Sequence, residues 1–335
     1  MKKRQITIKD IAKALHISPS TVSRSLADHP DISQETKNIV NAYAREHKYK
    51  PNALALSLRT NNTKTIGVIL PQIVHYFFSS VLSGIEDEAE KGGYRVIICQ
   101  SNENYEKEVK GAQALLEARV CGVLASVAKT TTIYNHFQEL IDSDIPMVFF
   151  DRICTGILTD RVVVDDYAGV CSAVEYLIRS GCRRIAFFGS PSHLAISNNR
   201  RMGYEDALRK NGLPVDKELI KICDNYTEAL RLTPELLSLP NRPDAFFAVN
   251  DETAIGVLNV VKAKGLRIPD EVSICGFTNN SLAEVSDPLL TSVDQHGYEL
   301  GAMRLLIERL NGVRDGDRIV SKIIKTNLVV RQSTR

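Results

Sequence analysis

The chain has 335 residues, more than one domain usually holds, and 44% of them are hydrophobic while 24% are charged. This balance is typical of a globular protein with a sizeable core and excludes a disordered or fibrous chain. The N-terminus carries charge with no apolar stretch after it, and no apolar run approaches the ~18 residues that cross a bilayer. The sequence therefore predicts a cytoplasmic protein of two or more domains, with no membrane segment.

Seven cysteines are scattered along the chain, and none belongs to a Cys-x-x-Cys pair. Their odd number and apolar surroundings predict buried thiols in a reducing compartment. The sequence also has no zinc-ligand spacing, no glycine-rich nucleotide loop and no nucleophile elbow. We therefore expect no metal, no cofactor and no enzymatic activity.

The charge is divided unevenly along the chain. Residues 1–65 contain 12 basic and 5 acidic side chains, whereas the remaining 270 residues contain 30 basic and 35 acidic ones. A basic head on a mildly acidic body indicates that the head contacts a polyanion. The alternative is a charged head that is merely solvated.

The head has the pattern of three short helices. Thr7 with Asp10 predicts the start of the first, and Ser18 before Pro19 predicts the start of the second, after a break at His16-Ile17. A third helix is expected at residues 33–47. The side chains expected to pack inward are Ile8, Ile11, Ala12, Leu15, Val22, Leu26, Ile39, Val40 and Ala44.

This order of helices is typical of a helix-turn-helix, whose second helix enters the major groove of DNA with its N-terminal residues. Here those residues are Ser20, Thr21, Ser23 and Arg24. Hydroxyls contact bases or phosphates, and Arg donates two hydrogen bonds to guanine. Alternatively, they are solvent-facing polar residues of a small helical domain.

The next segment, residues 49–60, is rich in leucine and too short to be stable alone as a helix. It would fit a segment that folds on contact with DNA and wedges apolar side chains into the minor groove. The alternative is an interdomain helix packed on its neighbours.

From residue 63 onward, short apolar strands alternate with helices, which predicts parallel sheets covered on both faces. The expected strands are 65–70, 94–99, 122–127, 146–150, 162–164, 184–188, 219–223, 245–249, 272–277, 291–293 and 319–330. They are too many for one comfortable sheet, so we expect two doubly wound lobes. A ligand would bind beyond the carboxyl ends of the strands, in a cleft between the lobes.

Aromatic and polar side chains follow these strands, a combination suited to binding a polyhydroxyl compound. They include Phe77, Phe78, Asp151, Arg200, Tyr226, Asn250, Asp251, Thr278 and Gln295. Taken singly, Asp151 could be a turn residue, Asn250-Asp251 could cap a helix, and the two phenylalanines could belong to the core.

The motifs Ile8-Lys9-Asp10-Ile11-Ala12, Ser18-Pro19-Ser20-Thr21-Val22-Ser23-Arg24 and Tyr49-Lys50-Pro51-Asn52, with Ala55 and Leu58, resemble the signature of the lactose-repressor (LacI/GalR) family. The resemblance runs through essentially the whole chain. It implies an α/β protein with a three-helix helix-turn-helix head (1–49), a hinge helix and linker (50–62), and a two-lobed, doubly wound parallel-sheet, periplasmic-binding-protein-like effector domain (63–335). Lobe 1 is expected at about 63–163 and 294–322, and lobe 2 at about 164–293 and 323–335.

The resemblance also implies which residues bind DNA and effector. The expected DNA contacts are Thr7, Ser18, Ser20, Thr21, Ser23, Arg24, Asn52, Ala55, Leu58 and Arg59, with Leu58 as a lever between central base pairs. The effector contacts are expected among the strand-end residues named above. Two positions depart from the pattern: Pro19 replaces a DNA-contacting side chain of many relatives, and Thr278 replaces a ligand-binding Asp, so that either the ligand differs or Asn279 takes over.

We expect a repressor that binds a pseudopalindromic double-stranded operator as a homodimer, under allosteric control by a sugar-like effector. A transport solute-binding protein and a cytoplasmic sugar enzyme are the alternatives; the first lacks a signal peptide and the second a catalytic constellation. A dimer is preferred to a tetramer because no heptad segment follows residues 319–330. The sequence leaves open the effector, the operator and the choice between induction and corepression.

Overall fold

The computed structural model describes residues 6–49, 63–74, 76–295, 297–313 and 318–335. Contacts between Cα atoms divide the chain into two compact units, 1–63 and 64–335. The predicted hinge at 50–62 lies outside the described residues, and so do its four expected DNA contacts, Asn52, Ala55, Leu58 and Arg59.

The first unit contains the three expected helices, α1 (Ile8–Ala14), α2 (Pro19–Leu26) and α3 (Gln34–Glu46). Thr7 and Asp10 form a capping box at α1: the Thr7 hydroxyl oxygen accepts from the Asp10 amide, and the Asp10 carboxylate accepts from the Thr7 amide. Ser18 caps α2 by accepting from the Thr21 amide at 3.0 Å. His16, at φ +54°, turns the chain between α1 and α2.

The core of this unit is formed by Ile11, Ala12, Val22, Val40 and Ala44. The expectation that Ile39 also packs inward is wrong, because its side chain is 50% exposed. Successive residues of a helix point about 100° apart. Since Val40 and Ala44 take the inward face of α3, Ile39 is left facing solvent.

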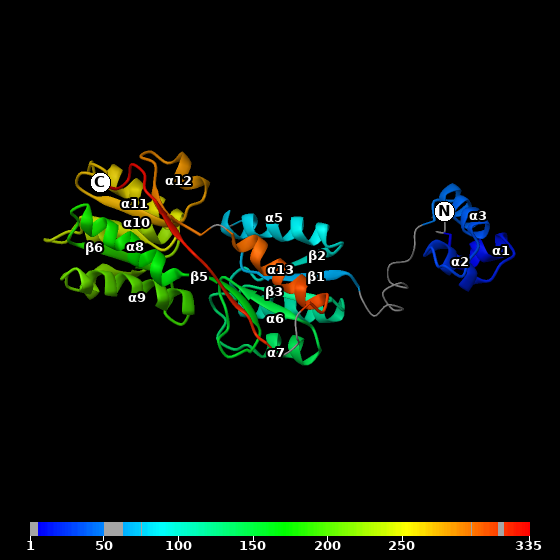
Figure 1. Cartoon of the computed structure of the whole chain (residues 1–335). Coiled ribbons are helices and arrows are strands. Elements are labelled where there is room, and N and C mark those ends of the chain that lie inside the picture. The colour runs from blue at the N-terminus through cyan, green and yellow to red at the C-terminus, as the bar shows by residue number, and fades with distance from the viewer. Residues whose placement is uncertain (1–5, 50–62, 75, 296, 314–317) are drawn as a thin grey trace. The chain divides into compact units, whose positions relative to one another are not determined.

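The second unit contains the two predicted sheets, which Figure 1 shows as separate lobes. The first lobe has an all-parallel sheet in the order β11-β5-β4-β3-β1-β2. Its strands are β1 (Thr65–Leu70), β2 (Arg95–Gln100), β3 (Gly122–Ala125), β4 (Met147–Phe150), β5 (Asp160–Val164) and β11 (Ser321–Ile324). Its helices are α5 (Tyr76–Lys91), α6 (Tyr105–Glu117), α7 (Asn135–Asp142) and α13 (Tyr298–Leu310).

The second lobe has a sheet in the order β12-β10-β9-β8-β6-β7, in which only the edge strand β12 runs antiparallel. Its strands are β6 (Ile185–Gly189), β7 (Ile220–Ile222), β8 (Ala245–Ala248), β9 (Ser273–Thr278), β10 (Thr291–Asp294) and β12 (Asn327–Val329). Its helices are α8 (Asp166–Arg179), α9 (Ala195–Lys210), η1 (Lys217–Leu219), α10 (Tyr226–Leu237), α11 (Asp251–Ala263) and α12 (Ser281–Val285).

Successive side chains of a strand point to opposite faces of the sheet. A fully apolar strand is therefore buried only where helices cover both faces, and both sheets meet this condition. In β8, Phe247 packs in the core that includes α8 and α9, whereas Phe246 packs in the core that includes α10 and α11. In β4, Phe150 and Phe149 divide in the same way between the α5/α13 side and the α6/α7 side. The sequence prediction of doubly wound parallel sheets is confirmed.

The chain passes between the lobes at three places: between β5 and α8, between β10 and α13, and between β11 and β12. The third passage corrects the expectation of one strand at 319–330, since this segment forms two strands in different sheets (Figure 1, red). A continuous run of strand-forming residues gives no sign of where a chain changes its hydrogen-bonding partner. All seven cysteines are free, but Cys99 and Cys121 are only half-buried.

Gly203 allows α8 and α9 to pack closely. A Cβ at Gly203 would lie 2.5 Å from the Tyr167 carbonyl oxygen, which belongs to the backbone of α8. Gly203→Ala should therefore lower the free energy of unfolding by about 1–3 kcal/mol, measured by urea denaturation of the full chain.

Gly156→Ala is the matched control, because a Cβ there meets only the Cys154 sulfur, at 3.8 Å. We expect it to change stability by less than about 0.5 kcal/mol. An equal effect of both substitutions would contradict the packing assigned to Gly203.

Candidate functional site

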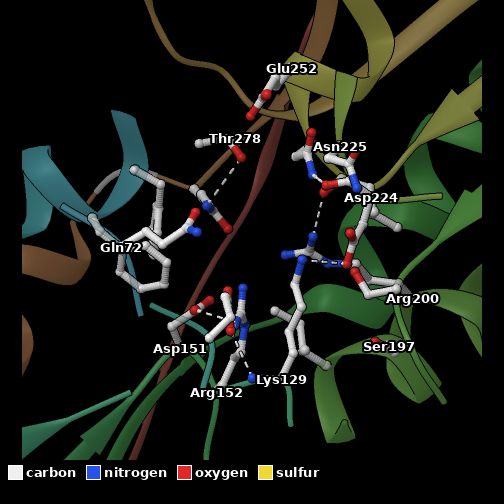
Figure 2. A pocket seen from close by; sticks show the side chains of 18 residues that line it. Gln72, Lys129, Asp151, Arg152, Ser197, Arg200, Asp224, Asn225, Glu252 and Thr278 are labelled. Carbon is white, nitrogen blue, oxygen red and sulfur yellow. Dashed lines mark hydrogen bonds and ion pairs between the residues drawn. The ribbon is translucent and has the colours of Figure 1, made fainter. Parts of the chain in front are cut away.

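A cavity of about 840 Å³, counting its open mouth, lies between the two lobes (Figure 2). Its walls come from residues that follow the carboxyl ends of the strands. The first lobe contributes Gln72, Phe77 and Phe78 after β1, Glu103 after β2, Lys129 after β3, and Asp151 and Arg152 after β4. The second lobe contributes Ser190, Ile196, Ser197 and Arg200 after β6, Asp224 and Asn225 after β7, Val249, Asn250 and Glu252 after β8, Thr278 at the end of β9, and Gln295 after β10.

Seven of the nine effector residues expected from the sequence line this cavity: Phe77, Phe78, Asp151, Arg200, Asn250, Thr278 and Gln295. Tyr226 and Asp251 are not among the lining residues. The Tyr226 hydroxyl accepts a hydrogen bond from Asn259 at 3.1 Å. Asp251 is fully buried and accepts from the Asn280 amide and the Ser292 hydroxyl. Asn279 does not line the cavity either.

Arg200 is held in place by three contacts in the second lobe. Its Nε lies 2.7 Å from an Asp166 carboxylate oxygen, and its Nη1 donates to the Val249 carbonyl at 2.6 Å. Its guanidinium lies 3.8 Å from the centre of the Phe277 ring. Burial raises the pKa of the Asp166 carboxyl to about 6, although the Arg200 charge acts in the opposite direction.

Arg152 is held in the first lobe. Its Nη1 lies 2.8 Å from each carboxylate oxygen of Glu103, and its guanidinium lies 5.7 Å from the centre of the Phe78 ring. Glu103 also accepts from the Lys129 amide at 2.7 Å, which fixes the loop after β3. These contacts fix the first-lobe wall of the cavity.

Two contacts join the lobes at the cavity. Figure 2 shows Lys129 extending from the first lobe toward Asp224 of the second, and its Nζ lies 2.8 Å from Asp224 Oδ2. His193, between β6 and α9, has its Nε2 2.6 Å from the Lys129 carbonyl oxygen. An opening of the cleft at this point must therefore break an ion pair and a hydrogen bond.

The backbone is unusual at two of the strand ends. Asp151 has φ +57°, Thr278 +120° and the neighbouring Asn279 +56°, values that non-glycine residues rarely adopt. Such residues cost about 1–3 kcal/mol each and cluster at functional sites. Asn250 combines two roles, since it caps α11 by accepting from the Thr253 amide and also lines the cavity.

The sequence reasoning did not assign eleven of the 18 residues that line the cavity to the effector site. Among the polar residues it missed are Gln72, Glu103, Lys129, Arg152, Ser190, Ser197, Asp224, Asn225 and Glu252. Asp224 directly follows the expected strand 219–223, so the strand-end rule could have found it. Arg152 lies two residues after the expected strand 146–150 and was noted there, but it was not assigned to the site. Glu103 and Lys129 lie further along their loops, where sequence spacing gives no direction for the side chain.

The DNA-contact residues of the head lie on or next to α1 and α2. Ser20 and Arg24 are exposed, while Thr21 and Ser23 are half-buried. Thr7 and Ser18 are the N-caps of α1 and α2, and both are exposed. The Ser18 hydroxyl lies 2.7 Å from that of Ser20 and 2.8 Å from that of Thr21. Hydroxyls and a cation are thus gathered at one side of α2.

A helix-turn-helix unit together with a two-lobed α/β unit that encloses a cavity defines a transcriptional regulator with a separate ligand-binding body. Residues 7–52 match the lacI family of bacterial regulatory proteins, and residues 174–334 match the periplasmic binding protein-like domain. The HTH-type transcriptional repressor CytR of Escherichia coli (strain K12) is 33% identical, over 98% of this chain and 96% of that protein. The chain belongs to the LacI family of bacterial regulatory proteins, whose matching relatives are transcriptional regulators and not enzymes.

Two solved structures show the same fold. The transcriptional regulator CelR in complex with cellobiose is 25% identical, with a TM-score of 0.74 over 98% of this chain and 100% of that one. The lac repressor dimer bound to operator and the anti-inducer ONPF is 21% identical, with a TM-score of 0.87 over 99% of each chain. Within the described residues, no helix is long and apolar enough to cross a membrane. The same residues contain no group of three or more His, Cys, Asp or Glu side chains that could hold a metal ion.

The burial of Asp251 predicts a pH effect on stability. Burial raises the pKa of its carboxyl from an ordinary 3.8 to about 7. The folded protein then binds this proton more tightly than the unfolded chain, so the resulting stabilisation is present at low pH and is lost as the pH rises through about 7.

Asp251→Asn removes this titration and keeps an oxygen that can accept from the Asn280 amide. The stability of the unchanged protein relative to this variant should therefore fall as the pH rises from 3.8 to about 7, measured by urea unfolding at several pH values. Parallel stability curves over that range would contradict the assigned burial effect.

Proposed function

We propose that the protein is a cytoplasmic repressor that binds a pseudopalindromic operator as a homodimer, and that a sugar or sugar derivative in the interlobe cavity sets its affinity for DNA. The observation that carries the proposal is the cavity itself, whose walls come from both lobes. A ligand in contact with both lobes favours one arrangement of them, and only such differential binding can shift a conformational equilibrium.

The side chains of the cavity support a sugar as effector. Phe77 and Phe78 offer ring surfaces to the apolar face of a sugar, while Asp151, Asn250 and Gln295 offer carboxylate and amide groups to its hydroxyls. The related regulator CelR was solved as a cellobiose complex. In this proposal Tyr226 and Asp251, which do not line the cavity, act by supporting α10 and α11.

DNA reading is assigned to the head. The hydroxyl and cationic side chains of Ser20, Thr21, Ser23 and Arg24 read the major groove, and Thr7 and Ser18 contact phosphates at the N-termini of their helices. Asn52, Ala55, Leu58 and Arg59 enter the minor groove, by resemblance to the family. One head buries too little surface for tight specific binding, which requires a dimer on two half-sites.

Arg24→Ala should weaken operator binding by about 1–3 kcal/mol if this side chain contacts a base. The loss should be largest for the intact operator and smaller for random DNA of equal length, measured by fluorescence anisotropy at fixed salt. Arg45→Ala, which removes another exposed charge, from α3, is the matched control. Equal losses for the two variants would assign Arg24 to non-specific attraction.

The proposal as a whole is tested by selecting the full-length protein against a random duplex library at near-physiological salt, then screening the enriched DNA against a sugar panel. We expect a pseudopalindrome and at least one sugar that changes its affinity. Enrichment of no sequence, with and without sugars, would contradict the proposed DNA reading.

A further inference from the structure

We propose that the effector is an uncharged polyhydroxyl compound and that the cavity rejects phosphate esters, because each cationic side chain that the described residues bring to the cavity already holds a carboxylate. This inference rests on the proposed effector site and narrows its chemistry. It follows from the ion pairs, the balance of charge and the polar atoms left without partners.

The three cations of the described cavity wall are Lys129, Arg152 and Arg200. Their carboxylate partners, Asp224, Glu103 and Asp166, lie within 2.7–2.8 Å. The paired side chains are largely withdrawn from solvent, with exposures from 5% to 26%. A phosphate that displaced one of these carboxylates would leave it buried and uncompensated, which is unfavourable. A phosphate that bound the remaining guanidinium donors would meet a cation whose charge is already balanced by its carboxylate.

The balance of charge acts in the same direction. Four carboxylates, Glu103, Asp151, Asp224 and Glu252, line the cavity against the three cations, and Asp166 lies directly behind Arg200. A phosphate ester carries a charge of about −1.5 to −2 at neutral pH. The negative field of the cleft therefore opposes the entry of a phosphate ester, whereas an uncharged sugar carries no net charge for this field to repel.

Two neutral polar atoms of the wall lack hydrogen-bond partners among the described residues. They are the Ser197 hydroxyl oxygen and Gln295 Oε1, both buried. Buried polar atoms of this kind are rare without a partner, so they mark positions for ligand groups. Gln295 Oε1 only accepts hydrogen bonds, so it needs a donor. A sugar hydroxyl provides one, whereas a phosphate dianion placed at this position does not.

Matched pairs of probes test the inference by isothermal titration calorimetry on the full-length protein: ribose and ribose 5-phosphate, glucose and glucose 6-phosphate, and cellobiose and its 6′-phosphate. We expect at least one uncharged sugar to bind, and its ester to bind at least about tenfold more weakly. Tighter binding of an ester than of its parent would overturn this inference while the proposed function stands. Failure of every probe would instead count against the sugar effector itself, and with it this inference.

Asp224→Asn tests the cause. It keeps the shape of the side chain and leaves Lys129 without its carboxylate, so affinity for the ester of the binding sugar should rise by about ten- to a hundredfold. Glu103→Gln, which does the same for Arg152, is a second variant in case the first does not fold. Glu252→Gln removes one negative charge from the same wall and leaves all three ion pairs intact. If Glu252→Gln raised the affinity for the ester by the same factor, the role given to the carboxylate-paired cations would be overturned.

Discussion

The parallel direction of the strands is the constraint on which the rest of the molecule depends. Because all strands of the first sheet and all but β12 of the second run parallel, the residues that follow them gather at the carboxyl edge of each sheet. Nine strands, β1 to β4 and β6 to β10, supply residues to one cavity in this way. Apolar strands buried on both faces leave the strand ends as the place where polar chemistry can lie without disturbing a core.

The two lobes are joined in ways that differ in strength. Three covalent passages connect them, and the Lys129–Asp224 ion pair and the His193 contact join them across the cleft. The passages keep the lobes attached in any arrangement, whereas the non-covalent contacts can form and break as the cleft opens and closes. Allosteric control in such a molecule requires a ligand whose contacts differ between two lobe arrangements, and a cavity with walls from both lobes provides this.

Periodicity and strand-end position predicted the head and the two sheets. Together with the family resemblance they also predicted nine effector positions, of which seven line the cavity. They failed where tertiary packing decides. Ile39 has the hydrophobicity of a core residue, but Val40 occupies the inward face of α3 and Ile39 faces solvent. Residues 319–330 have the pattern of one strand, but they divide between two sheets. Asp251 follows a strand as a ligand residue would, yet its side chain turns inward to Ser292 and Asn280. Lys129 and Glu103 were missed because only folding brings each to its partner.

The central claim is that one cavity and one DNA-binding surface are energetically coupled. The most direct test measures two affinities on the same protein: that for the operator, with and without saturating effector, and that for the effector, with and without saturating operator. Thermodynamic linkage requires the two ratios to be equal, and we expect a common factor of about 5 to 150 in either direction. A ratio of one in both measurements, with the effector bound in the cavity, would contradict the account.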